Sequence, residues 1–210
     1  MVGKGRSNPL ALAVLVCLYE APMHPYEVSQ TLRARHKDES VRLNYGSLYA
    51  VIESLHKRGL VAVAETERSG RLPERTIYRI TDAGVHELRD WLAELLAVPH
   101  KEYPDFEAAL SFLPAVAPDE ALQLLRDRLE RLELAIAGYE AARQLVEKGG
   151  LPRLLWVEAE FAHARHQAER AFTQALVEEI AGGTLDGLVW WRQLHETGGD
   201  VEAPWSRAAR

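Results

Sequence analysis

The hydrophobic pattern of residues 44–80 predicts one short helix followed by two strands. Within residues 44–60 the apolar side chains recur every three or four positions, which is the period of a helix with one buried face. These inner residues are Leu48, Val51, Ile52 and Leu55. Asn44 is a candidate N-cap and Gly59 a candidate C-terminal stop, so we expect about four turns of helix. The opposite face is small and polar and carries Ser47, Ala50, Ser54 and Lys57.

Residues 61–80 alternate between apolar and other positions, which predicts a β-hairpin. Its polar turn contains Gly70 and carries three arginines, Arg68, Arg71 and Arg75. This order is typical of a winged helix, in which the helix enters the major groove of DNA and a wing arginine reaches the minor groove or phosphates. An amphipathic helix with a hairpin is also ordinary α+β architecture, so the pattern alone leaves DNA binding open.

Three short blocks resemble the signature blocks of the PadR transcriptional regulators. They are residues 21–27 (APMHPYE), residues 46–49 (GSLY) with Leu55 and Gly59-Leu60, and residues 78–84 (YRITDAG). The blocks occur in the family's order, and the motif resemblance covers about residues 8–90. Pro25 stands where the family usually has glycine, and Ala50 where a proline is common, so the local helix geometry is in question.

The resemblance implies a DNA-binding winged helix followed by a helical dimerisation domain, with release by phenolic or lipophilic compounds. The expected fold is therefore mostly α with a small β-hairpin: a winged helix-turn-helix domain at residues 1–98, a helical dimerisation and effector domain at 104–196, and a flexible tail at 197–210. Further helices are predicted at residues 9–20, 25–36 and 82–98 of the first domain. The residues expected to contact DNA are Tyr26, Tyr45, Gly46, Ser47, Tyr49, Ala50, Ser54, Lys57, Arg68, Arg71 and Arg75.

The charged residues are also distributed unevenly between the two predicted domains. The net charge is −6, but residues 1–82 hold 12 Lys and Arg against 9 Asp and Glu, whereas residues 83–210 hold 13 against 22. DNA affinity is therefore expected only in the first part. Cys17 is a single cysteine in an apolar run, which favours a buried thiol in the cytoplasm over a redox sensor. No stretch is long and apolar enough for a membrane span.

The second part predicts long helices with two apolar seams. A short helix is expected at residues 105–113, a long one from Pro118, and another after Pro152. The seam residues assigned to dimerisation are Leu122, Leu125, Leu129, Leu132, Ile136, Tyr139, Leu154, Val157 and Phe161. Their heptad-like spacing favours a homodimer. The alternative is a helical bundle within one chain that uses Trp190 and Trp191.

Catalytic motifs are missing from the sequence. The Glu160-x-x-His163 spacing is that of a di-iron helix, but such a site needs a second copy, so we expect ion-paired or solvated side chains with no metal and no cofactor. Four aromatic residues, Trp91, Tyr103, Phe106 and Trp156, form a candidate pocket for a small apolar or aromatic effector, although aromatic side chains more often fill a core.

The predicted function is that of a non-enzymatic, ligand-responsive repressor in the cytoplasm. As a homodimer it would bind a pseudo-palindromic operator in double-stranded DNA. The alternative is a winged-helix module that docks a protein and does not bind DNA. The wing arginines favour the DNA-binding hypothesis.

Overall fold

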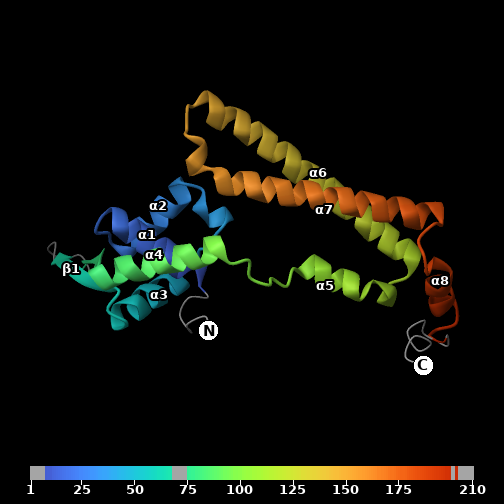
Figure 1. Cartoon of the computed structure of the whole chain (residues 1–210), viewed down its shortest axis with the longest axis horizontal. Coiled ribbons are helices and arrows are strands. Elements are labelled where there is room, and N and C mark those ends of the chain that lie inside the picture. The colour runs from blue at the N-terminus through green and yellow to red at the C-terminus, as the bar shows by residue number, and fades with distance from the viewer. Residues whose placement is uncertain (1–7, 68–74, 200–201, 203–210) are drawn as a thin grey trace. The chain divides into compact units, whose positions relative to one another are not determined.

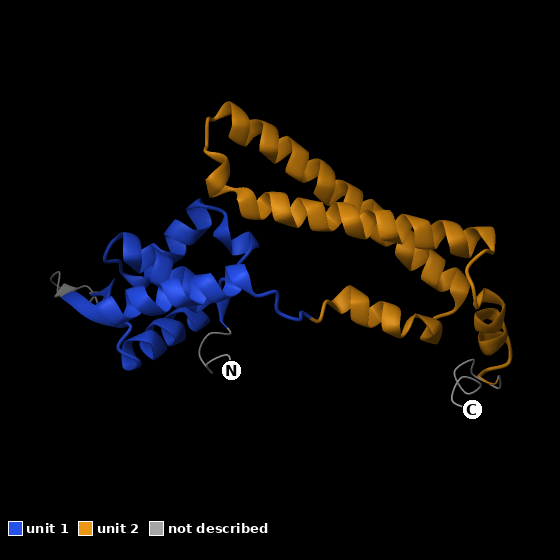
Figure 2. Cartoon of the chain, in the orientation of Figure 1, with its two compact units in different colours: residues 1–102 blue, residues 103–210 orange. Residues whose placement is uncertain are grey.

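The computed structural model describes residues 8–67, 75–199 and 202, which belong to two compact units (Figures 1 and 2). Unit 1 comprises residues 1–102 and unit 2 residues 103–210. The division falls inside the stretch 99–104, where two prolines flank polar residues. No helix in the described part of the chain is long and apolar enough to cross a membrane.

Unit 1 is a helical domain with one hairpin. Its elements are α1 (Pro9–Glu20), α2 (Pro25–Ala34), the 3-10 turn η1 (Lys37–Glu39), α3 (Tyr45–Lys57), β1 (Val61–Glu67), β2 (Arg75–Ile80) and α4 (Asp82–Ala97). This order confirms the predicted winged-helix fold. The second helix is shorter than expected, because His36 adopts a left-handed conformation with φ of 53° and the helix has ended at Ala34.

Polar side chains fix where these helices begin. Asn8 Oδ1 accepts from the backbone N–H of Leu10 at 3.0 Å, and Asn44 Oδ1 accepts from that of Gly46 at 2.9 Å. At α2, His24 Nδ1 accepts from the backbone of Tyr26 while the carboxylate of Glu27 accepts from the backbone of His24. Each contact satisfies a backbone donor that the first helical turn leaves without a partner.

The core of unit 1 lies between α1, α2, α3 and α4. Leu15 of α1, Val28 of α2 and Leu48 of α3 are completely buried. The apolar face predicted for residues 44–60 is confirmed, because all four inner residues of α3 are in this core. Trp91 of α4 belongs to the same core.

The hairpin is antiparallel and attached to the rest of unit 1 through its second strand. Val61 pairs with Ile80 and Val63 with Tyr78, and the register shifts between Val63 and Glu65. Tyr78 also exchanges two backbone hydrogen bonds with Met23, both 3.0 Å long. The loop between α1 and α2 therefore holds the base of the wing in place.

Unit 2 contains only helices in its described residues. They are α5 (Asp105–Ser111), η2 (Leu113–Ala115), α6 (Pro118–Lys148), η3 (Arg153–Leu155), α7 (Val157–Gly182) and α8 (Leu188–Glu196). The two long helices form an antiparallel hairpin (Figure 1). The short helix expected over residues 105–113 stops at Ser111, and η2 follows it. The α8 helix was not predicted, and most of the expected tail lies outside the described residues.

The first apolar seam of α6 packs mainly within its own chain. Leu125 and Leu129 are buried with Val177 and Ile180 of α7 and with Trp191 of α8. Leu132 is also buried, while Leu122, Ile136 and Tyr139 are half-buried. The expectation that this seam faces a second chain is therefore wrong for its buried leucines. The intrachain bundle that uses Trp190 and Trp191 describes them better, because α7 folds back along α6.

Candidate nucleic-acid interface

The outer face of α3 is open to solvent along its length. Ser47, Ala50, Ser54 and Lys57 lie along this face and are all exposed, as is Gly46 in the first turn. The side chains of Ser47, Ala50 and Ser54 are small. A helix with such a face fits a major groove about 12 Å wide.

Two tyrosines of the expected interface are partly exposed. Tyr26 in the first turn of α2 has 43% of its surface exposed, and Tyr49 of α3 has 50%. The hydroxyl oxygen of Tyr26 accepts a hydrogen bond from Gln30 Nε2 at 3.1 Å. Both hydroxyl groups therefore belong to residues that solvent, or a phosphate, can approach. Tyr45 begins α3, but its side chain is outside the described part of the structure.

An acidic residue that was not identified from the sequence lies beside this face. Glu53 lies next to Lys57 on α3, and their charged atoms are 2.6 Å apart. The hydrogen bond from Lys57 lowers the pKa of Glu53, so the carboxylate is charged at neutral pH. The i, i+4 spacing in a helix could have revealed this pair. Lys57 therefore presents less net positive charge to a phosphate than an unpaired lysine would.

The wing is described only in its strands. Arg68 and Arg71 lie outside the described residues, and Arg75 begins β2 opposite Glu67. Arg79 of β2 is exposed and alternates with the inner residues Tyr78 and Ile80. It was not included among the residues that were expected from the sequence to contact DNA. Arg42, in the segment before α3, is exposed as well.

The four aromatic residues expected to form an effector pocket do not gather within either unit. Trp91 is buried in the core of unit 1, and Tyr103 is 82% exposed. In unit 2, the Phe106 ring lies 3.7 Å from the guanidinium carbon of Arg128, whereas Trp156 lies beside Tyr139. Arg128 and Tyr139 are about 16 Å apart along α6, from the helical rise per residue. The aromatic spacing in the sequence therefore did not identify one pocket.

Glu160 and His163, which have the spacing of a di-iron helix, both contact other side chains. Arg153 binds Glu160 through two nitrogens, and His163 stacks on Tyr139. Among the residues that the structure describes, no three His, Cys, Asp or Glu side chains gather closely enough to hold a metal ion.

Together, the hairpin, the four packed helices and the open face of α3 define a winged-helix DNA-binding protein. Residues 14–90 match the transcriptional regulator PadR-like family. This match covers the winged helix and identifies the protein as a DNA-binding transcriptional regulator with a PadR-like domain. The alternative of a winged-helix module that only docks a protein has no support.

Similarity to individual proteins extends beyond the winged helix. The negative transcriptional regulator PadR of Bacillus subtilis is 20% identical over 154 residues, which cover 73% of this chain and 83% of that protein. The structure of Bacillus subtilis PadR with operator DNA has a TM-score of 0.66 and 18% identity, and the match covers 82% of this chain and 99% of that one. The structure of the same protein with p-coumaric acid has a TM-score of 0.62, 16% identity and coverages of 82% and 95%.

Proposed function

We propose that this protein is a homodimeric repressor in the cytoplasm that binds a pseudo-palindromic operator and leaves it when an aromatic effector binds. The proposal includes no catalysis and no cofactor. The observation that carries DNA recognition is the contrast between the two faces of α3, whose inner residues Leu48 and Leu55 are fully buried while its outer stripe is exposed. The similar Bacillus subtilis protein is a negative regulator, which supports repression.

In this proposal the two parts of the interface have different tasks. Ser47, Ala50 and Ser54 would face base edges in the major groove, where hydrogen bonds and apolar contacts determine sequence preference. Tyr26, Arg42 and the arginines of the hairpin would contact phosphates, which fixes the position of the helix without reading sequence. The exposed side chains of Arg42 and Arg79 add two cations to those expected from the sequence.

Dimerisation is supported by apolar side chains that α6 and α7 leave uncovered. Leu134 and Leu145 lie 11 residues apart on α6, and Phe161 and Phe172 lie 11 residues apart on α7, so each pair shares one helix face. Leu134 is 73% exposed and Phe161 is 67% exposed. Leu154 and Val157, also expected at the interface, remain exposed. Large exposed apolar patches mark interaction sites, so we assign this surface to the second chain.

The direct tests are gel-shift and footprinting assays with the DNA upstream of the protein's own coding region. Binding should protect two half-sites about 34 Å apart and should weaken steeply as salt rises. Ala50→Glu should abolish binding, because it places a negative charge on the outer face of α3. Ala93→Glu on the exposed side of α4 is the matched control and should bind normally. Equal binding by both variants would refute the assignment of α3.

A further inference from the structure

Unit 2 contains an open cleft at the turn that joins α6 to α7. The cleft has a volume of about 730 Å³, which is within the range of small-molecule sites. It is lined by the last turns of α6, the loop that includes Gly150 and Leu151, η3 and the beginning of α7. Of its lining residues, Trp156 was expected from the sequence to contribute to an effector pocket.

One wall of the cleft consists of stacked rings. Tyr139 of α6 stacks on His163 of α7, with ring centres 4.1 Å apart and an angle of 18° between the planes. Trp156 also lies near Tyr139, with ring centres 6.4 Å apart. Aromatic walls favour ligands that are themselves flat, because flat rings stack with little loss of conformational freedom.

Two buried polar atoms at this wall lack hydrogen-bond partners within the described chain. They are Nε1 of Trp156 and Nδ1 of His163. An indole nitrogen can only donate, so it requires an acceptor, and leaving a buried donor without one costs about 1–3 kcal/mol. A ligand acceptor that reaches Nε1 of Trp156 after a small movement of the indole ring would remove this cost.

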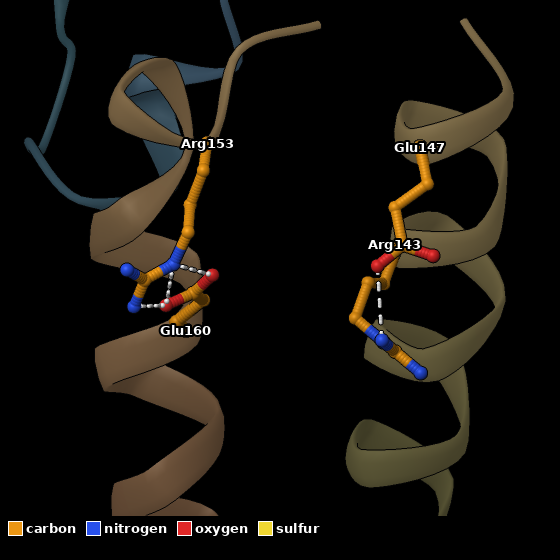
Figure 3. A network of polar contacts seen from close by, with 4 residues as sticks. All are labelled: Arg143, Glu147, Arg153 and Glu160. Atoms are coloured by element: carbon orange, nitrogen blue, oxygen red, sulfur yellow. Dashed lines mark hydrogen bonds and ion pairs between the residues drawn. The ribbon is translucent and has the colours of Figure 1, made fainter. Parts of the chain in front are cut away.

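The charges of the cleft decide which ligand it would prefer. Both of its arginines are already paired: Arg153 donates to Glu160 at 2.5 and 2.7 Å, and Arg143 donates to Glu147 at 2.9 Å (Figure 3). The lining also includes Glu140, so it holds three glutamates against two arginines.

The pKa of Tyr139 reflects the same excess of negative charge. Burial raises the pKa of Tyr139, and the charge of Glu160 raises it further. Both causes oppose a negative charge at the aromatic wall. An anionic ligand would therefore have to displace a glutamate from its arginine before it could bind.

We propose that this cleft binds a planar aromatic cation that carries a hydrogen-bond acceptor. The rings of Tyr139 and Trp156 would hold its flat face, the indole N–H of Trp156 would donate to its acceptor, and Glu140 would balance its charge. This ligand differs in charge from p-coumaric acid, which is bound by the similar Bacillus subtilis protein. All residues of this binding site belong to unit 2. Only the effect of the ligand on operator binding rests on the proposed function.

The test is calorimetric titration of the full-length protein, without DNA, with three quinolines that differ in charge. They are a methoxy-N-methylquinolinium cation, the neutral methoxyquinoline and a quinoline carboxylate. We expect the cation to bind at least fivefold more tightly than the neutral compound, and the carboxylate to bind least. Tighter binding of the carboxylate, or no binding of any of the three, would overturn the proposal.

Variants locate the site. Trp156→Phe keeps a ring but removes the N–H, and it should weaken binding of the cation about five- to tenfold, as expected for one hydrogen bond. Glu140→Gln should weaken the cation and leave the neutral compound unchanged, whereas Glu130→Gln on the same helix should affect neither. Circular dichroism checks that the variants are folded. Equal affinities for the wild type and Trp156→Phe would place the ligand elsewhere.

Operator binding is measured separately, so that the two proposals can fail independently. Release of the operator by the cation, lost in Trp156→Phe, would support both. Binding in the cleft without release would keep the site and refute effector control through it. Release that persists unchanged in Trp156→Phe would keep effector control and refute this site.

Discussion

Replacing Gly84 with alanine should destabilise unit 1, although the same change stabilises most helices. Gly84 lies in the first turn of α4, and a Cβ there would overlap the carbonyl oxygen of Leu60 and lie 2.7 Å from Cγ1 of Ile80. The Leu60 carbonyl cannot easily move, because it accepts a hydrogen bond from the backbone N–H of Thr81 at 3.0 Å. The methyl group must therefore push apart the end of α3, the hairpin and α4.

The magnitude follows from two opposing contributions. Alanine in a helix is favoured over glycine by about 1 kcal/mol. Overpacking a tight contact costs about 1–3 kcal/mol and sometimes more, and here the contact involves backbone that is fixed by hydrogen bonds. At the upper end of that cost, about 3 kcal/mol, we expect a net loss of about 2 kcal/mol in the free energy of unfolding. Operator affinity should fall as well, because Leu60 connects α3 to β1.

Urea unfolding followed by circular dichroism measures this loss. Gly138→Ala is the matched control, since Gly138 is also helical and a Cβ there has no heavy atom within 4 Å. That change should raise the free energy of unfolding by about 1 kcal/mol. If Gly84→Ala were as stable as the wild type, the close approach of α4 to Leu60 would not constrain the fold as argued.

Other features of the structure predict further measurable effects. Phe161→Glu should yield monomers in light scattering, whereas Val189→Glu, at an exposed position of α8, should remain dimeric; two dimers would refute the proposed interface. Burial raises the pKa of the Cys17 thiol to about 11, so at pH 8 the native protein should react with a thiol reagent about a hundredfold more slowly than a thiol of pKa 9.0; rapid reaction would contradict its burial. Glu53→Gln should raise affinity for all DNA sequences, because Lys57 then presents its full charge; unchanged binding in gel shifts would separate this pair from the DNA surface.

In unit 1, the helix boundaries that depend on neighbouring residues could be predicted from the sequence. The expected bounds of α1 match because Pro9 begins a run that Ala21-Pro22 ends, and α3 begins after Asn44 as its side chain dictates. The end of α2 depends on the left-handed conformation of His36, for which the residue type gave no signal. The wing could be predicted as a hairpin because its two strands alternate and a turn with Gly70 joins them. Arg68 and Arg71 lie outside the described residues.

The seam of α6 shows a limit of periodicity. A repeat of leucines every three or four residues identifies the face that must be buried, but it contains no information about which helix covers that face. Leu125 and Leu129 could equally pack against α7 of their own chain or against another chain. The turn at Gly149 and Gly150 allows α7 to return along α6, and α8 adds Trp191 to the same core. The proposed dimer would therefore use other residues, such as Phe161.

The cleft in unit 2 shows why the spacing of metal ligands does not by itself make a metal site. Glu160 and His163 are three residues apart, so they lie on neighbouring positions of one helix face, and this is the geometry for which metal ligands are selected. What decides their role is Arg153, which neutralises Glu160, and Tyr139, which stacks on His163. Neither contact follows from a helical repeat, since Arg153 precedes α7 and Tyr139 belongs to α6. The same face of α7 is therefore better suited to hold a flat organic molecule than a metal ion.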